Sequence, residues 1–302
     1  MIGANGFLGS CLVDRLAADG TAVTAFDRYS GAPRHAVGDG VRVVQGDFLN
    51  EAHVEPALAG CETVFHFLSL STPADSGLDP GFDVRTNTLA TVRLLQLAVE
   101  SGVSRFLFAS SGGTVYGPSA PAGGHKEDEA LHPLSPYGIS KVAIENYLSY
   151  FAQVAGLSSV SIRMSNPFGP QQKPSKKQGL IPILLRAVRD GRPVSMLGDG
   201  SMRRDYIYVD DAVDMIMRIA TREPEHAAYN VGSGRGSSLT EIFELVASVS
   251  GRELQIEHAP QPAWFVEESV LDMTRFTTEF GDLTQTPLVE GMRRTWEAIR
   301  DE

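Results

Sequence analysis

The sequence opens on the stretch Gly3-Ala4-Asn5-Gly6-Phe7-Leu8-Gly9, and an apolar helical pattern from Cys11 to Leu16 follows it directly. Glycines at this spacing allow a tight turn, a close approach of the backbone to a pyrophosphate, and close packing of a helix on a strand. The start of the helix offers free N–H groups and a positive dipole end to phosphate oxygens. This stretch therefore predicts a dinucleotide-binding loop between a strand and a helix.

An acidic residue follows at the distance that such a loop requires. The apolar run Ala22–Phe26 ends in Asp27, and an acidic residue about 20 positions beyond the glycines binds the adenosine ribose hydroxyls. Its charge repels a 2′-phosphate, so we expect NAD rather than NADP, although the neighbouring Arg28 weakens that preference.

The strand that normally precedes the glycines is missing. Only Met1 and Ile2 come before Gly3, whereas a dinucleotide fold needs a full strand there, in the middle of its sheet. We expect that the sequence lacks its true first residues; the alternative is a natural truncation that leaves a gap. Intact-mass analysis of the native protein distinguishes the two, since a mass that starts at Met1 contradicts our expectation.

Further strand and helix patterns alternate along the first half of the chain. Predicted strands are Val41–Asp47, Thr63–Leu68 and Arg105–Ser111, and a helix is expected to begin at Asn87. Asp47 is placed to meet an adenine, and the small polar residues that end the last strand lie where open α/β sheets bind ligands. This alternation predicts an α/β fold with a doubly wound, mostly parallel sheet. We interpret His66, inside the second of these strands, as a packed core histidine rather than a catalyst.

Composition excludes several classes of function. Hydrophobic residues make up 42% and charged residues 21% of the 302 residues, as is ordinary for a soluble enzyme. A net charge of −11 argues against nucleic acid or an anionic membrane as a partner. Cys11 and Cys61 form no CxxC motif and the histidines do not cluster, which indicates a reducing cytoplasm and no metal site. No apolar run approaches the roughly 20 residues of a membrane span, and no signal peptide is present.

Tyr137 and Lys141 are the candidate catalytic pair. They stand four residues apart in Pro136-Tyr137-Gly138-Ile139-Ser140-Lys141, at the start of a helical pattern that reaches Phe151. Residues at this spacing share one face of a helix. An ammonium beside a phenol lowers a phenol pKa of ordinarily about 10, so the pair would act as a base near neutral pH. The alternative is surface decoration of an amphipathic helix.

An ordered set of motifs extends along nearly the whole chain. It comprises Gly3, Gly6 and Gly9, then Asp27, Gly46-Asp47, Ser110–Gly117, Tyr137–Lys141, Arg163–Pro170, Gly198–Asp211, Tyr229–Gly234 and Pro287–Gly291. In this order the motifs resemble the extended short-chain dehydrogenase/reductase family, specifically its NAD-dependent sugar-nucleotide epimerase/dehydratase group, with UDP-glucose 4-epimerase-like members as the nearest type.

The resemblance implies NAD as cofactor and assigns a role to individual residues. Tyr137 matches the catalytic base, and Lys141 matches the lysine that holds the nicotinamide ribose and depresses the tyrosine pKa. Asn166 and Arg204 match residues that contact the sugar nucleotide and its diphosphate; the alternatives are a turn residue before Pro167 and a surface ion pair with Asp205. The implied cofactor-binding residues are Gly3, Gly6, Phe7, Leu8, Gly9, Asp27, Asp47, Phe48, Phe67, Asn87 and Lys141.

The chain departs from the family pattern around Gly112, where relatives carry a Ser or Thr that assists the tyrosine. Ser111 and Thr114 are the hydroxyls available instead, and the sequence does not decide between them. Sugar-nucleotide 4,6-dehydratases carry an Asp-Glu pair where this chain has Gly113-Thr114. We therefore do not expect dehydration.

A second departure lies near the C-terminus, where relatives often have an arginine that grips the diphosphate. Here the run is Pro262-Ala263-Trp264-Phe265, whose aromatic rings would stack on a base or sugar or simply pack in a loop. The missing contact to the diphosphate would come from Lys173, Lys176 or Lys177, unless these belong to a solvated loop.

Ser269 matches a position beside the sugar C2 substituent. Its small size implies that N-acetylhexosamine nucleotides are accepted, and absent turnover of UDP-N-acetylglucosamine counts against this.

The expected organisation is a dinucleotide-binding domain over residues 1–165 and a smaller α/β substrate-binding portion over 166–302, with the chain crossing back between them. The resemblance implies a homodimer through the helices near Asn87–Glu100 and Tyr137–Ala152. It also implies NAD-dependent epimerisation, at C4 of a UDP-hexose or UDP-N-acetylhexosamine, through a 4-keto sugar. Two alternatives stay open: an NAD(P)-linked keto-sugar reductase, and a catalytically silent NAD-binding sensor or scaffold.

Overall fold

A parallel sheet forms the centre of the molecule in the computed structural model, which describes residues 1–118, 121–172, 179–260 and 266–302. Its strands are β1 (Val23–Asp27), β2 (Val41–Gln45), β3 (Thr63–His66), β4 (Arg105–Ser111), β5 (Ser158–Met164) and β9 (Ala228–Val231). β2 pairs with β1, and β3, β4, β5 and β9 follow one another, all parallel. Ile2 bridges Phe26 of β1 and His66 of β3, so the first two residues occupy the middle position of the sheet.

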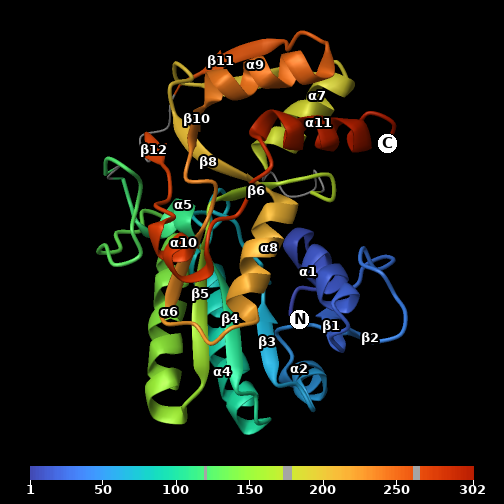
Figure 1. The fold of residues 1–302 in the computed structure, drawn as a ribbon, viewed down its shortest axis with the longest axis vertical. Coiled ribbons are helices and arrows are strands. Elements are labelled where there is room, and N and C mark those ends of the chain that lie inside the picture. The colour runs from blue at the N-terminus through green and yellow to red at the C-terminus, as the bar shows by residue number, and fades with distance from the viewer. Residues whose placement is uncertain (119–120, 173–178, 261–265) are drawn as a thin grey trace.

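Helices cover both faces of this sheet. On one face lie α2 (Glu51–Leu58), α4 (Ala90–Glu100) and α6 (Pro136–Ala155); on the other lie α1 (Phe7–Ala18) and α8 (Val209–Ala220) (Figure 1). Strand β4 shows why helices can pack on both faces of the sheet. Phe106 and Phe108 belong to the apolar cluster on the first face, and Leu107 and Ala109 belong to the cluster on the second face. Alternate side chains of a strand point to opposite faces. The prediction of a doubly wound α/β fold is confirmed.

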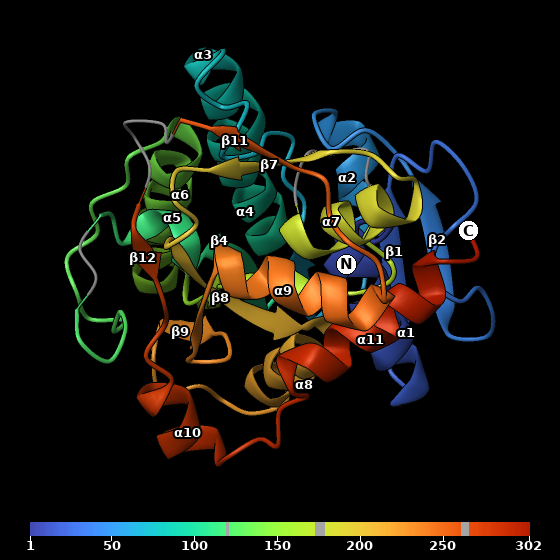
Figure 2. The same ribbon diagram turned by 90° about the horizontal axis from the view of Figure 1, so that it is seen from above.

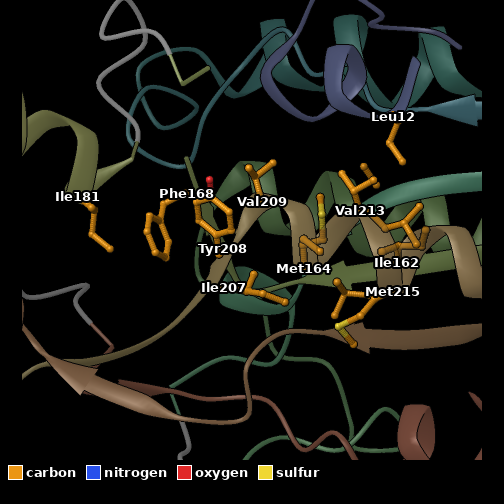
Figure 3. Close-up of a cluster of buried hydrophobic side chains, with 14 of the residues drawn as sticks. Leu12, Ile162, Met164, Phe168, Ile181, Ile207, Tyr208, Val209, Val213 and Met215 are labelled. Atoms are coloured by element: carbon orange, nitrogen blue, oxygen red, sulfur yellow. The ribbon is translucent and has the colours of Figure 1, made fainter. Parts of the chain in front are cut away.

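The apolar cluster under α1 and α8 continues beyond the parallel sheet. Figure 3 shows part of this cluster, with Ile181, Phe168 and Tyr208 at one end and Val213, Ile162 and Leu12 at the other. Because this core is continuous, the later part of the chain packs directly on the sheet.

A second group of elements lies at the carboxyl ends of the parallel strands. Strand β8 (Arg203–Tyr208) pairs with β6 (Asn166–Phe168), β10 (Gly236–Ser238) and β12 (Glu268–Ser269), while β7 (Val194–Leu197) pairs with β11 (Ile256–Ala259). Helices α7 (Leu180–Arg189), α9 (Leu239–Ser250) and α11 (Leu288–Ile299) cover this end, and Figure 2 looks down on it with α9 and α11 nearest the viewer. Helix α10 (Thr274–Phe280) packs beside β9. Within the described residues, no helix has the length and apolar character needed to cross a membrane.

The helix expected to begin at Asn87 begins earlier, so that prediction is wrong. Helix α3 (Pro80–Asp83) leads into a π-helical turn, η1 (Val84–Leu89), and then into α4. The side chain of Asp79 accepts the Phe82 N–H at 2.8 Å and Pro80 occupies the first turn, which together form a standard helix start. Asn87 therefore lies inside a helix, and single π turns of this kind are frequent at functional sites.

Candidate active site

The glycine loop has a shape that only glycine can adopt. Gly3 has a φ of 87°, and a Cβ on it would lie 2.9 Å from the Leu68 backbone nitrogen; a Cβ on Gly9 would collide with the Gly3 carbonyl oxygen. Gly6 precedes α1, and no described side chain caps that helix start. Phe7 and Leu8 form its first turn, so their N–H groups point toward the end of the sheet where a pyrophosphate would bind.

The other candidate cofactor residues surround this loop. At the end of β1, the Asp27 carboxylate accepts the Asn5 N–H at 2.9 Å and the Arg28 N–H at 2.7 Å. Phe67 follows β3 and its backbone passes against Gly3. Beyond β2, the Asp47 carboxylate accepts the Leu49 N–H at 3.0 Å. These residues line the point where the strand order reverses, which is the usual ligand position in such sheets.

Two further candidates lie deeper. Phe48 is buried, with its ring centre 5.2 Å from that of His66. Asn87 is buried as well, and its amide accepts the Leu70 N–H at 3.0 Å and donates to the Ser71 hydroxyl at 2.7 Å. Together with the glycine cradle, which a Cβ would fill, and the carboxylate of Asp27, the site fits a dinucleotide.

Tyr137 and Lys141 lie on one face of α6, as predicted. Ser135 caps this helix by accepting the Gly138 N–H at 3.1 Å, and Pro136 forms its first turn. The Lys141 ammonium is buried, donates to the Ala109 carbonyl oxygen at 2.6 Å, and lies 5.2 Å from the centre of the Tyr137 ring. The ring of Phe108 lies 4.6 Å from the same ammonium. The pair thus sits beside the carboxyl end of β4.

Burial and nearby charges act on the protonation of this pair. Burial lowers the pKa of Lys141 to about 8, and the charges of Asp83 and Glu145 oppose that lowering. Burial, and then the charge of Asp83, raises the pKa of Tyr137 above its ordinary value. In the protein alone these two effects favour the phenol, because loss of hydration disfavours the charged phenolate; the lowering of the tyrosine pKa by Lys141 stays a prediction.

The surroundings of Gly112 explain the absence of a side chain there. A Cβ would lie 2.7 Å from a methyl group of Leu271 and 3.2 Å from the Arg163 carbonyl oxygen. Of the two hydroxyls available, Ser111 ends β4 and precedes the short helix α5 (Gly112–Val115). The Thr114 hydroxyl is buried and has no hydrogen-bond partner among the described residues. The backbone carbonyl oxygen of Thr114 would touch a Cβ on Gly138. Thr114 therefore lies against Gly138, the residue that follows Tyr137.

The three candidate substrate residues meet on adjacent strands around β8. Ser269 pairs with Arg204, and Asn166 pairs with Tyr206, two residues further along β8. The Arg204 guanidinium donates to the Val266 carbonyl oxygen at 2.6 Å and to that of Arg203 at 2.7 Å. Burial lowers the pKa of Arg204. Ser269 is itself buried.

The structural alternatives for Arg204 and Asn166, a surface ion pair with Asp205 and a turn residue before Pro167, are both wrong. Asp205 is completely buried and accepts the Ser233 N–H at 2.8 Å and the Gly234 N–H at 3.1 Å, so it does not pair with Arg204. Asn166 opens β6 rather than a turn, and its amide donates to the Asp205 carbonyl oxygen at 2.9 Å. The expectations for Lys173, Lys176, Lys177 and the run 262–265, including Trp264 and Phe265, lie outside the described residues.

One buried acid near the pair escaped the sequence analysis. Asp83 accepts hydrogen bonds from Ser71, Ser140 and Asn87. Its position four residues before Asn87, on the same helical face, was the available signal. His66, in contrast, is a packed histidine as predicted: it bonds to the Thr91 hydroxyl at 2.9 Å, and burial with the charge of Lys141 lowers its pKa to about 3.

A parallel, doubly wound sheet with a glycine loop at the carboxyl ends of its strands, and a buried Tyr–Lys pair beside them, is the arrangement of a dinucleotide-dependent enzyme. The sequence agrees: residues 1–232 match the profile of the NAD-dependent epimerase/dehydratase family. The chain belongs to this family.

Relatives match along the whole chain. The UDP-glucose 4-epimerase of Mycolicibacterium smegmatis is 35% identical over 306 residues, covering 99% of this chain and 97% of that protein. The solved UDP-glucose 4-epimerase of Thermotoga maritima with UDP-glucose superposes with a TM-score of 0.93 at 32% identity, covering 99% and 97%. That of Thermus thermophilus in complex with NAD gives 0.91 at 32% identity, with the same coverage.

Replacement of Gly9 by Ala tests the cofactor loop. Because the added methyl group collides with the Gly3 carbonyl oxygen, the loop must open, and we expect NAD affinity to fall about tenfold or more, equivalent to at least about 1.4 kcal/mol. The control is Gly77→Ala, an exposed position where a Cβ meets nothing within 4 Å. Calorimetric titration with NAD measures both, and equal affinities would contradict the role of the loop.

Proposed function

We propose that this protein is an NAD-dependent epimerase that inverts C4 of a UDP-hexose or UDP-N-acetylhexosamine through a transient 4-keto sugar. The observation that carries the proposal is the Tyr137–Lys141 pair in a chain that matches a UDP-glucose 4-epimerase over 99% of its length. Gly113 and Thr114 offer no acid or base for loss of water, which supports epimerisation over dehydration.

The chemistry follows from the groups around the pair. When bound, NAD⁺ supplies a hydride acceptor, a hydride donor for the return step, and a positive charge that favours the phenolate. Tyr137 takes the proton from the sugar 4-hydroxyl and later returns it to the oxygen of the 4-keto intermediate, when the opposite configuration forms at C4. Lys141, held by the Ala109 carbonyl oxygen, keeps a positive charge 5.2 Å from the centre of the Tyr137 ring. The Thr114 hydroxyl is buried and has no hydrogen-bond partner among the described residues, so we assign the sharing of the proton with Tyr137 to Thr114 rather than to Ser111.

Substrate contacts are assigned to the strands around β8. Arg204 contributes a positive charge for the diphosphate, since a guanidinium pairs well with phosphate oxygens. Asn166 on β6 and Ser269 on β12 flank it. We divide the chain into a cofactor domain, residues 1–165, and a substrate portion, residues 166–302, from which α8 and β9 return to the parallel sheet.

The protein is proposed to be a cytoplasmic homodimer. Exposed apolar side chains follow one face of α6, with Ile139, Tyr147, Tyr150 and Val154 at 42–60% exposure, and Val84 and Leu89 stand on η1 nearby. Such a stripe on two neighbouring helices suits a four-helix interface with a second copy. Cys11 and Cys61 are free, as in a reducing compartment.

Incubation with UDP-glucose, UDP-galactose and UDP-N-acetylglucosamine, followed by proton NMR, tests the activity. We expect interconversion of 4-epimers without net change in nicotinamide absorbance. Tyr137→Phe should bind NAD but lower turnover about 10²–10⁴-fold, as expected for loss of a general base. Stoichiometric consumption of reduced cofactor would instead identify a keto-sugar reductase, and wild-type turnover by Tyr137→Phe would exclude the tyrosine mechanism.

Alanine substitutions distinguish the two hydroxyls. We expect Thr114→Ala to lower kcat by about tenfold or more, because a hydrogen bond to the transferring proton is lost, while Ser111→Ala has a smaller effect. Steady-state kinetics with UDP-glucose measure both variants. A larger loss in Ser111→Ala would assign the assisting hydroxyl to Ser111.

Charge substitutions test the interface. The double change Tyr150→Glu and Val154→Glu should yield monomers in light scattering after gel filtration, because it buries like charges at the contact. The control is Val289→Glu, an exposed apolar position on α11 (45% exposed), which should leave the mass unchanged. A double variant that keeps the mass of a dimer contradicts this interface.

A further inference from the structure

Asp83 is a buried carboxylate to which the proposed mechanism gives no role. It ends α3 and has 0% exposure. Its oxygens accept hydrogen bonds from the hydroxyls of Ser71 and Ser140, and from the Asn87 amide at 2.9 Å. All three donors are neutral, and no described lysine, arginine or histidine forms a salt bridge with Asp83. A carboxylate buried in this way is costly unless its charge interacts favourably with something nearby.

The Tyr137–Lys141 pair is what lies nearby. Ser140, one of the donors to Asp83, directly precedes Lys141 in α6, so the carboxylate contacts the helix turn that carries the pair. Its negative charge favours the Lys141 ammonium and opposes a Tyr137 phenolate. The carboxylate thus acts on both groups in the same direction, toward the protonated form.

The other ionisable groups around the pair have partners or are neutral. Glu145, one turn further along α6, pairs with Arg163 of β5 at 2.7 Å. His66 of β3 is neutral, since its pKa is lowered to about 3. Arg85 of η1 is exposed and lies 3.8 Å from Asp79. Two carboxylates, Asp83 and Glu145, act on Lys141 through their charge. Glu145 has a salt-bridge partner in Arg163, whereas no salt bridge to Asp83 is formed within the described residues.

We propose that Asp83 is a positioning residue that holds the resting pair as a neutral phenol beside an ammonium. The inference deepens the proposed epimerase site and rests on that function only for its kinetic test. Ser71, Ser140 and Asn87 fix the carboxylate in place. Its charge adds to burial in favouring the Tyr137 phenol and opposes burial in favouring the Lys141 ammonium.

The first test is the pH profile of Asp83→Asn, which removes the charge and keeps the shape. The pKa values of Tyr137 and Lys141 should both fall, so both limbs of the kcat/KM profile should move to lower pH by about one unit. Ser71→Ala is the matched control, because it removes a hydrogen bond to the same carboxylate and leaves the charge. An Asp83→Asn profile at the wild-type position, with a lowered melting temperature, reduces Asp83 to a structural role and overturns the proposal.

A second test needs no turnover, so its failure is separate from failure of the proposed function. Tyrosinate absorbance is followed against pH in the wild type and in Asp83→Asn, each minus its Tyr137→Phe counterpart. The difference isolates Tyr137, and we expect it to ionise at lower pH in Asp83→Asn. Ionisation at the same pH overturns the proposal, whatever the protein catalyses.

The third test holds even where Asp83→Asn alone folds poorly. Lys141→Met removes the ammonium and leaves Asp83 as a buried, uncompensated charge. Adding Asp83→Asn to Lys141→Met should raise the melting temperature, although Asp83→Asn lowers it in the wild-type background. Equal lowering in both backgrounds means that the two charges are not coupled, and the proposal fails.

Discussion

The hydrogen bond from the Lys141 ammonium to the Ala109 carbonyl oxygen, at 2.6 Å, is the interaction on which the site depends. It joins the first turns of α6 to the end of β4 through a buried cation. Such a cation is tolerated only where acceptors and opposite charges compensate the lost hydration, and here Ala109, the Phe108 ring and two carboxylates do so. Because α6 is fixed at this point, its first turn is held at the end of the sheet, with Gly138 against the Thr114 carbonyl oxygen.

The second group of elements is tied to the same point by packing rather than by charge. Leu271, which follows β12, fills the space beside Gly112. Asp205 of β8 accepts the backbone N–H groups of Ser233 and Gly234, which follow β9. Strand β8 carries Arg204 and pairs with both β6 and β12, so any shift of these strands would also move Leu271 against α5. The candidate substrate residues and the Tyr–Lys pair therefore belong to one packed unit.

How much the sequence could predict follows from the range of each interaction. The glycine loop, strand β4 and the Tyr137–Lys141 face depend on residues within a few positions, so spacing alone identifies them. The role of Asp83 depends on Ser71 and Ser140, which lie 12 and 57 positions away, and the gap at Gly112 depends on Leu271. Neither the contacts of Asp83 nor the space around Gly112 can be predicted from neighbouring residues in the sequence. The early start of the helix before Asn87 was readable from Asp79-Pro80, and the sequence interpretation overlooked it.

The sign of the tyrosine pKa shift shows most clearly what spacing cannot supply. The spacing of Lys141, four residues after Tyr137, predicts a phenolate, whereas burial and the charge of Asp83 favour the phenol. In the protein alone, burial and Asp83 therefore favour the phenol form of Tyr137; in the mechanism that we propose, the positive charge of bound NAD⁺ would favour release of the proton. Without that positive charge the phenol would again be favoured. A base with this dependence can take a proton in one half of a cycle and return it in the other, which a reaction without net oxidation requires.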